Sequence, residues 1–405
     1  MNALQSVLTN GPPSRSLPIG RESAMLRGLG RVRAAATACY LSGTREMVRR
    51  LIGGRSGPRD FHRIIIAGPL GRQNGVGQGA YLQWTALRRR GVDAELIDAA
   101  PGLRNPLFRV GHQPGSAYII HAGGPQAANL LATVLPHAAR AHRVAYFAWE
   151  LPDPPPDWAG CDRHFDEIWT PSTFSRESLQ KLLDRPIHVV PHHVTAQTMR
   201  ERDDCWPFTV LVMADSRSSL SRKNPEGALR SFQLAFGASP RARLILKLSG
   251  RAAELDAFES SCGHLLAARN VKVIRSYLHG TALAQLYRSA DVLLSMHRAE
   301  GFGLPLLEAM AHGVPAVATG WSGNMDFMSP LDSELVPYRL VPVQDLSRIY
   351  SSSMWAEPDI EAAACALRRL ADDRAHYFKI ATAAYHRVAN APSLFPFKVP
   401  EHVSS

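Results

Sequence analysis

Two glutamates, Glu300 and Glu308, stand with seven residues between them in the segment 297–319. An apolar run at 292–294 precedes them and predicts a buried strand. Pro305 favours the first turn of a helix that carries Glu308, because proline lacks the N–H group that this turn leaves unpaired. Both carboxylates are therefore expected at one strand-to-helix junction, which is where α/β folds bind ligands. Carboxylates accept hydrogen bonds, so the pair suits a compound with several hydroxyl groups.

The residues between the glutamates begin with the run Gly301–Pro305, which reads Gly-Phe-Gly-Leu-Pro. With its flanking glutamates, this run resembles the donor-binding signature of the retaining glycosyltransferases of family four, which have the GT-B fold. The resemblance implies that Glu300 binds hydroxyls of a donor sugar and that Glu308 binds the ribose of its nucleotide. It also implies that the backbone of the intervening loop lies at the donor: Gly301, Phe302, Gly303 and Leu304. An acidic pair at an ordinary strand-to-helix turn is the alternative interpretation.

Three basic residues, Arg217, Arg222 and Lys223, follow a predicted strand at 208–213 and precede Pro225, which opens a predicted helix. When a nucleotide diphosphate sugar loses its sugar, negative charge grows on the leaving diphosphate, and cations at a helix N-terminus stabilise it. The family resemblance places one Arg and one Lys on this diphosphate. Lys223 fits the second role, and Arg217 is the first choice for the other, with Arg222 as its competitor. A solvated basic loop is the alternative.

Gly75, Val76 and Gly77 belong to a glycine-rich stretch that follows a predicted strand at 64–67. The stretch resembles the family's glycine loop, which faces the donor phosphate and the acceptor. Residues 75–80 also match the dinucleotide fingerprint G-x-G-x-x-A. That fold places its first glycine directly at the strand end, whereas about eight residues lie between them here. A plain turn is the third interpretation.

His121 follows a predicted strand at 117–120 and precedes two glycines. Members of the family often carry a His at this point, beside the anomeric carbon, so the resemblance makes His121 a candidate active-site group. A purely structural histidine is the alternative. Trp149 and Glu150 are candidates for the acceptor side, because sugars stack on aromatic rings, and they fit the core of the domain equally well.

Strands and helices alternate in two successive series along the chain. The apolar runs of the first sheet are 64–67, 95–97, 117–120, 144–148, 167–169 and 188–190, and those of the second are 208–213, 243–248, 271–274, 292–294 and 315–318. Two such series predict two doubly wound, Rossmann-like α/β domains that face a cleft, which is the GT-B arrangement. We expect a partly disordered basic extension at 1–58, an acceptor domain at 59–195, a nucleotide-sugar domain at 196–385 and a tail at 386–405.

The net charge of +11 is concentrated in residues 1–58, which contain nine Arg, no Lys and two Glu. A nucleic-acid-binding protein more often spreads basic residues over its folded domain. A basic appendage instead favours contact with an anionic membrane surface. A helical pattern at 22–51 fits either an interfacial membrane helix or a helix packed on the first domain.

The composition, with 45% hydrophobic and 20% charged residues, is typical of a soluble globular protein. No apolar run approaches the roughly 18 residues of a membrane span, and the first 15 residues lack the apolar core of an export signal. The five cysteines are scattered and read as reduced thiols. We therefore expect a cytoplasmic protein, with the inner face of the membrane as a further option.

Together with the family resemblance, which implies retention of the anomeric configuration, these features predict a metal-independent, retaining glycosyltransferase that moves a hexose from a nucleotide diphosphate sugar to a carbohydrate or lipid-linked hydroxyl acceptor. Polysaccharide or lipid-linked glycan synthesis is the expected setting. The candidate catalytic residues are His121, Glu300 and Lys223. No Asp-x-Asp occurs in the sequence, which removes the usual carboxylate clamp for a divalent ion, so no metal and no cofactor are expected.

Two other protein classes remain open. One is a non-catalytic protein of the same fold that binds a nucleotide sugar. The other is a GT-B sugar-nucleotide epimerase, although such epimerases lack the Glu-Gly-Phe-Gly-Leu-Pro context that this sequence has. A phosphorylase would need a lysine that binds pyridoxal phosphate and a longer chain.

Overall fold

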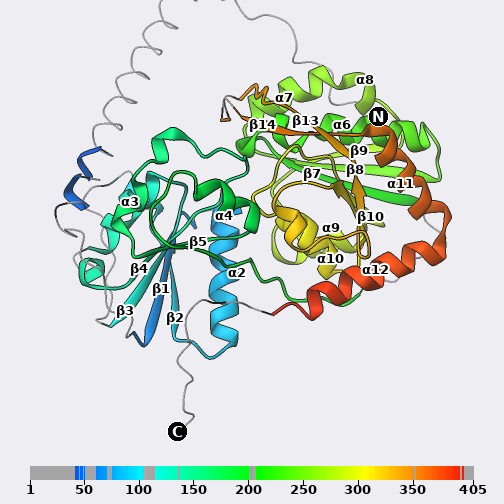
Figure 1. The fold of residues 1–405 in the computed structure, drawn as a ribbon. Coiled ribbons are helices and arrows are strands. Elements are labelled where there is room, and N and C mark those ends of the chain that lie inside the picture. Colours follow the sequence, from blue (N-terminus) through cyan, green and yellow to red (C-terminus); the bar gives the residue numbers. More distant parts are fainter. Residues whose placement is uncertain are drawn as a thin grey trace, which may run out of the picture.

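Two six-stranded parallel sheets form the centres of two domains that lie side by side (Figure 1). The computed structural model describes residues 42–44, 46–48, 50, 61–70, 75–103, 105, 115–135, 137–199, 202, 207–347, 349–350, 353–392 and 395. Most of the predicted extension at 1–58, including most of the helix expected at 22–51, lies outside these residues. The predicted fold of two doubly wound α/β domains is confirmed.

The sheet of the N-terminal domain has the strand order β2-β1-β3-β4-β5-β6. Its strands are β1 (Arg63–Gly68), β2 (Ala94–Asp98), β3 (Ser116–His121), β4 (Arg143–Tyr146), β5 (Glu167–Thr170) and β6 (Ile187–Val189). Its α-helices are α2 (Gly75–Arg89), α3 (Gln126–Leu131) and α4 (Thr173–Leu179). Strand β1, which lies between β2 and β3, is apolar from Ile64 to Ala67 because both of its faces are covered: Ile64 and Ile66 pack in one core cluster, and Ile65 and Ala67 in another.

The sheet of the C-terminal domain has the strand order β12-β11-β10-β7-β8-β9. Its strands are β7 (Phe208–Asp215), β8 (Ala242–Ser249), β9 (Val271–Arg275), β10 (Val292–Ser295), β11 (Ala316–Thr319) and β12 (Glu334–Val336). Its α-helices are α5 (Leu220–Lys223), α6 (Pro225–Phe236), α7 (Ala252–Ser261), α8 (Gly263–Leu266), α9 (Gly280–Arg288), α10 (Leu304–Ala311), α11 (Ile360–Asp372) and α12 (Arg374–Ala389). An antiparallel hairpin of β13 (Tyr338–Pro342) and β14 (Met354–Pro358) was not predicted.

Short 3-10 helices connect several of these elements. They are η1 (Ala100–Leu103), η2 (Ala132–Val134), η3 (His137–Arg140), η4 (Pro156–Trp158), η5 (Cys161–His164), η6 (Ser216–Ser218) and η7 (Gly323–Asp326).

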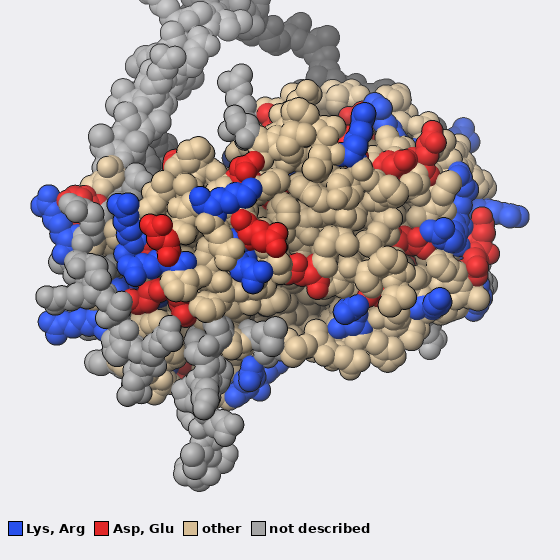
Figure 2. Space-filling view, in the orientation of Figure 1, with Lys and Arg blue, Asp and Glu red and all other residues tan. Residues whose placement is uncertain are grey.

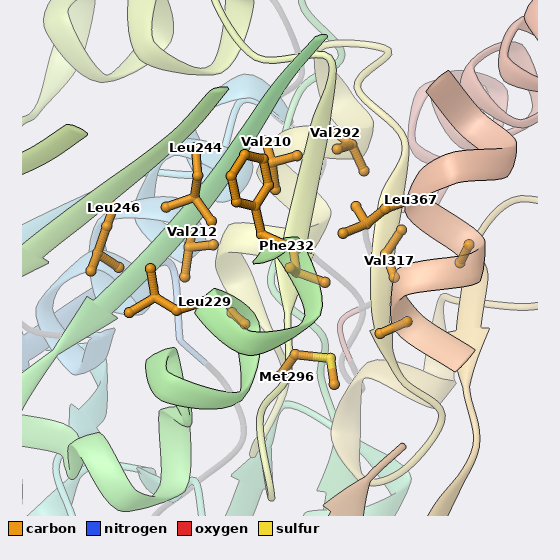
Figure 3. Packing of buried hydrophobic residues seen from close by; sticks show 14 of the residues in the cluster. Val210, Val212, Leu229, Phe232, Leu244, Leu246, Val292, Met296, Val317 and Leu367 are labelled. Carbon is orange, nitrogen blue, oxygen red and sulfur yellow. The ribbon is translucent and has the colours of Figure 1, made fainter. Parts of the chain in front are cut away.

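Alternate residues of the central strands β7 and β8 enter cores on opposite faces of the second sheet. On one face, Val210 and Leu244 pack against Phe232 of α6 and Leu367 of α11 (Figure 3). On the other face, Leu211 packs in the cluster that contains residues of α9 and α10. Burying a side chain of this size contributes roughly 1.5–3 kcal/mol. The sheet, packed on both faces, therefore gives the loops at its strand ends a rigid support.

The glycine-rich stretch differs from its prediction as a loop. Helix α2 begins at Gly75, so Gly75, Val76 and Gly77 form its first turn. The rest of the expected loop includes residues 71–74, which lie outside the described part of the chain. Helix α2 ends at Arg89, and Gly91 follows it with a φ of +77°.

Helix α12 runs to Ala389, beyond the domain end predicted at 385, and it leads back toward the N-terminal domain (Figure 1). Farther along, Phe395 packs on the N-terminal domain, with its ring centroid 6.2 Å from that of Trp169. The guanidinium of Arg90 lies 5.8 Å from the centre of the Phe395 ring. The chain therefore contacts its first domain again after completing the second.

Candidate functional site

A buried cluster of charges lies where the loop after β7 meets the loop after β10. The ammonium of Lys223 pairs with Oε1 of Glu300, and Nη1 of Arg222 lies 3.2 Å from its Oε2. Burial alone would raise the pKa of Glu300, but Lys223 and then Arg222 hold it at about 2. Glu300 is therefore a carboxylate that stays ionised between two cations.

Two helix-capping residues with positive φ position these cations. Ser219 has a φ of +66° and caps the short helix α5 by accepting the N–H of Arg222. Asn224 has a φ of +49° and caps α6, where its Oδ1 accepts the N–H of Gly227 at 3.0 Å. Lys223 stands between the two caps, directly before the N-terminus of α6. The predicted placement of Lys223 at that helix start is confirmed.

Arg222 and Arg217 occupy different positions. The Arg222 side chain is 3% exposed and donates to the carbonyl oxygens of Ala299 at 2.5 Å and Ser218 at 3.2 Å. Arg217 instead forms a bidentate pair with Asp215, with distances of 3.0 and 2.5 Å. The structure thus brings Arg222, the competitor in the sequence-based interpretation, to Glu300, while the first-choice Arg217 is held by Asp215.

The loop that carries Glu300 is braced by its neighbours. The Glu300 N–H donates to Oγ of Ser322 at 2.8 Å, and its carbonyl accepts the N–H of Gly323 at 2.9 Å. A side chain at Gly323 would collide with the backbone of Gly301. Gly303 adopts a φ of +98°, which a residue with a Cβ rarely does. The two glycines therefore allow Gly301, Phe302 and Gly303 to be presented in one fixed backbone arrangement.

Glu308 lies on α10, apart from this cluster. Its Oε2 accepts the hydroxyl of Tyr287 on α9 at 2.7 Å. Burial raises its pKa, while the Tyr287 hydroxyl and the ammonium of Lys247 oppose that rise. Among the described residues, no ion pair joins Glu308 to Lys223 or Arg222. The two glutamates thus share one strand-to-helix unit, as predicted, but have separate surroundings.

His121 ends β3 and is 1% exposed. Its Nε2 lies 2.7 Å from Oε1 of Gln83, and its ring stacks on Tyr146 with centroids 4.3 Å apart. Burial, and then His192, keep its pKa well below the usual value, so the ring is neutral. Within the described part of the chain, no hydrogen bond or ion pair links His121 to Glu300.

An aromatic series nevertheless connects His121 with the other domain. Tyr146 is followed by His192, with centroids 5.3 Å apart, and His192 meets Phe302 edge-on at 5.2 Å. Gly79 of α2 also packs on His192, because a Cβ there would collide with the imidazole ring. The glycine-rich start of α2 and the loop with Phe302 therefore contact the same side chain.

The N-terminal domain also contributes Glu150, whose Oε1 lies 3.8 Å from Nη2 of Arg222. The neighbouring Trp149 packs against Tyr350, with centroids 5.4 Å apart, and the ring of Tyr350 lies 5.7 Å from the Arg222 guanidinium. Trp149 and Glu150 were predicted either on the acceptor side or in the core, and they lie at the domain boundary. Tyr350 was missed because no sequence motif marks the hairpin loop that carries it.

The described residues contain no group of three His, Cys, Asp or Glu side chains placed to hold a metal ion. None of their helices combines the length and apolar character of a membrane span.

Residues 216–336, which contain the cluster of Lys223, Arg222 and Glu300, match the family model described as glycosyl transferases group 1. An uncharacterized glycosyltransferase of Methanocaldococcus jannaschii is 35% identical over 83 residues, which cover 20% of this chain and 21% of that protein. A probable sucrose-phosphate synthase of Arabidopsis thaliana is 28% identical over 176 residues, which cover 37% and 17%. The matched parts span about a fifth of the length of these curated relatives.

Solved structures resemble a larger part of the chain. HepE of Anabaena, in complex with UDP and glucose, has a TM-score of 0.58 at 14% identity and covers 81% of this chain and 95% of its own. The lipopolysaccharide outer core galactosyltransferase WaaB, in its apo form, has a TM-score of 0.52 at 12% identity, with 81% and 96% covered. At such identities the likeness shows the fold. The chain therefore has the GT-B fold, and its C-terminal domain carries a segment that matches the group 1 glycosyl transferases.

Proposed function

We propose that this protein is a retaining glycosyltransferase that transfers a hexose from a nucleoside diphosphate sugar to a hydroxyl acceptor without a metal ion. The observation that carries the proposal is the buried cluster of Lys223, Arg222 and Glu300 inside the segment that matches the family model. A carboxylate and two cations at a helix N-terminus suit a ligand that has both sugar hydroxyls and a diphosphate.

The Lys223 ammonium has three N–H groups, and one of them binds Glu300 within the described residues. The other N–H groups suit phosphate oxygens, whose charge grows as the glycosidic bond breaks. Glu300, kept ionised by the same cations, accepts hydrogen bonds from the donor sugar. No residue is assigned as a covalent nucleophile.

Glu308 and His121 contribute to donor binding in different ways. Glu308 accepts hydrogen bonds from the ribose, beside its present partner Tyr287. His121 keeps the N-terminal wall polar and uncharged, since its neutral ring is fixed by Gln83. The family match and the UDP and glucose in the HepE structure support a sugar nucleotide donor, with UDP-glucose as the first candidate.

Donor binding and turnover test the proposal. The full chain is screened by thermal unfolding with UDP-, GDP- and ADP-glucose. A true donor at 100 times its dissociation constant adds about 2.7 kcal/mol to stability. Release of the nucleoside diphosphate, measured with a mixture of carbohydrate acceptors, separates an enzyme from a non-catalytic binder. Stabilisation by none of the donors contradicts the proposed function.

Metal independence has its own test. Activity in excess EDTA is expected to stay within about twofold of the untreated enzyme, because fixed cations neutralise the leaving diphosphate. A tenfold loss, or about 1.4 kcal/mol, that magnesium or manganese restores would contradict this part of the proposal.

We also propose that the acceptor is part of a polysaccharide or a lipid-linked glycan, with residues 1–58 in contact with an anionic membrane. The nine arginines of this segment support the membrane contact. Each contributes about 1 kcal/mol near an anionic surface, and salt screens the attraction. A full-length variant with these arginines changed to Gln should lose its co-sedimentation with anionic vesicles at low salt. Unchanged sedimentation would assign the contact to the folded domains.

A further inference from the structure

Lys247 is a buried ammonium to which the proposed function assigns no ligand. The residue is 6% exposed, and its one hydrogen bond in the described part of the chain runs to Oγ of Ser249 at 3.2 Å. Its Nζ also lies 5.5 Å from the ring centre of Tyr277. Among the described residues, no carboxylate oxygen lies within the 4.0 Å of an ion pair. This lysine is therefore buried without a close anionic partner.

The strand pattern places Lys247 on the same face of the sheet as Glu308. Along β8, Leu244, Leu246 and Leu248 pack toward α6, whereas Ile245 packs in the cluster that contains residues of α9 and α10. Side chains alternate along a strand, so Lys247 and Ser249 continue the row of Ile245 toward the carboxyl end.

The register links this row to the loop that carries the cations. Met213 of β7 pairs with Lys247, and Asp215 pairs with Ser249. Oγ of Ser249 donates to Asp215 at 3.1 Å, and Asp215 in turn holds Arg217. Lys247 therefore lies toward the carboxyl edge of the sheet, where α/β folds bind ligands, and close enough to Asp215, Arg217 and Glu308 to interact with their charges.

Burial without a close counter-ion makes Lys247 unfavourable for folding alone. Moving an ammonium out of water is costly unless it is paired and fully hydrogen-bonded. Two of its three N–H groups have no hydrogen bond among the described residues. An apolar side chain of similar length would complete the core next to Met213 better. The position therefore favours a group that binds an anion.

We propose that Lys247 binds a phosphate oxygen of the nucleoside diphosphate, as a further cation of the donor site. The inference rests on the proposed function and adds a residue on β8 to the cluster around Lys223. Ser249 orients the ammonium, and the face of Tyr277 stabilises its charge.

The test compares Lys247→Met with the matched control Lys272→Met, which changes an exposed lysine on the neighbouring strand β9. Thermal unfolding is measured without ligand, and calorimetry measures binding of UDP, uridine and inorganic pyrophosphate. The Lys247→Met protein should unfold at the same or a higher temperature than wild type, since an unpaired buried charge is removed. It should bind UDP and pyrophosphate at least tenfold more weakly, with the affinity for uridine unchanged. The control should match wild type throughout.

Other results contradict the assignment of Lys247, the proposed function, or one of them without the other. A Lys247→Met protein that is destabilised but binds UDP as tightly as wild type would show a structural lysine. An equal loss of affinity for uridine and UDP would place Lys247 at the base or ribose instead. Wild type that binds pyrophosphate through Lys247, but no UDP, GDP or ADP, would keep the anion site and contradict the proposed function. Wild-type binding of UDP with an unaffected variant would keep the function and remove Lys247 from it.

Discussion

Glu300 accepts from two buried cations that belong to the same short segment. Its side chain is 10% exposed, against 14% for Lys223 and 3% for Arg222. Removing one partner of a buried ion pair leaves an uncompensated charge, and this costs more than the intact pair contributes. Replacing any one of Glu300, Lys223 and Arg222 is therefore expected to affect both the stability of the protein and the chemistry of the site.

Replacing Lys223 by alanine should lower turnover by about 10²–10³ at saturating donor, because one charge that stabilises the leaving diphosphate is lost. Steady-state release of the nucleoside diphosphate measures the effect. Lys379→Ala, which removes an exposed lysine from α12, serves as the control. Turnover of the Lys223 variant within threefold of wild type would remove Lys223 from the reaction.

Replacing Glu300 by glutamine should lower the free energy of unfolding at pH 7 by roughly 3–5 kcal/mol, because two buried cations lose their counter-charge. The folded-state pKa of about 2 lies below the ordinary value, which is about 4.3 for a free glutamate. The stabilisation is therefore complete above that ordinary value and is lost as pH falls through the folded one. Urea unfolding should show the two proteins converging between about pH 4 and pH 2. A gap that stays constant over this range would contradict the ion-pair account.

The sequence predicted the positions of Glu300 and Lys223 better than those of the arginines. The glycines and the proline around Glu300 predict a loop followed by a helix start, and Pro225 marks the helix start beside Lys223. The choice between Arg217 and Arg222 depends on Ser219, a non-glycine residue with positive φ. A positive φ is rare in residues other than glycine, so no residue pattern predicted that the chain turns at this position.

At the scale of elements, the parallel strands were predictable and the β13–β14 hairpin was not. Central strands such as β7 are buried on both faces and read as continuous apolar runs. The hairpin carries Pro342 and Pro358 at strand ends and exposes Tyr338 and Leu340. Proline and a mixed pattern both weaken a strand signal. The loop that brings Tyr350 to Arg222 therefore went unpredicted.

Asp345 holds that loop. Its carboxylate accepts hydrogen bonds from the hydroxyl of Ser219 at 2.5 Å and from the backbone N–H groups of Ile349 at 2.8 Å and Tyr350 at 3.1 Å. Burial opposes the ionised form, and these donors lower its pKa in spite of it. One side chain thus joins the hairpin loop to the loop of the cations.

Changing Asp345 to alanine should release Tyr350 from Arg222 while the sheets stay intact. Hydrogen exchange at the amides of Ile349 and Tyr350 should accelerate at least tenfold, since hydrogen bonds to a charged group contribute about 1.5–3 kcal/mol. Near-ultraviolet circular dichroism monitors the rest of the fold. Exchange that does not change would assign the order of the loop to the packing of Tyr350 on Trp149.

At the scale of the whole molecule, the two domains meet at the loop that presents Glu300. Oγ of Ser172, which caps α4, donates to the carbonyl of Gly301 at 2.6 Å, and the N–H of Thr173 donates to Asp326 at 2.7 Å. Phe174 meets Trp321 edge-on, with ring centroids 5.1 Å apart. Elsewhere on the visible surface, basic and acidic side chains are interspersed over both domains (Figure 2). Specific contacts therefore hold the domains together at the site.

Changing Asp326 to alanine should loosen this contact without unfolding either domain. Amide exchange at Thr173 should rise about fivefold, equivalent to ~1 kcal/mol for one hydrogen bond. Ser172→Ala should have a larger effect, because it also removes the cap of α4 and the bond to Gly301. Asp256→Ala, which breaks an exposed pair with Arg275, provides the control. Equal exchange in the Asp326 and control variants would show that the polar contacts do not hold the domains.

The return of the chain to its first domain affects how the protein is made. Trp169 leaves the ribosome long before Phe395, which packs on it, and the whole second domain is synthesised in between. Until then, part of the surface around Trp169 is bare, although the six strands of the first sheet can already pair. Nascent chains stalled before residue 395 should therefore carry a first domain that is folded but more easily cleaved by proteases, and longer chains that expose Phe395 should be better protected.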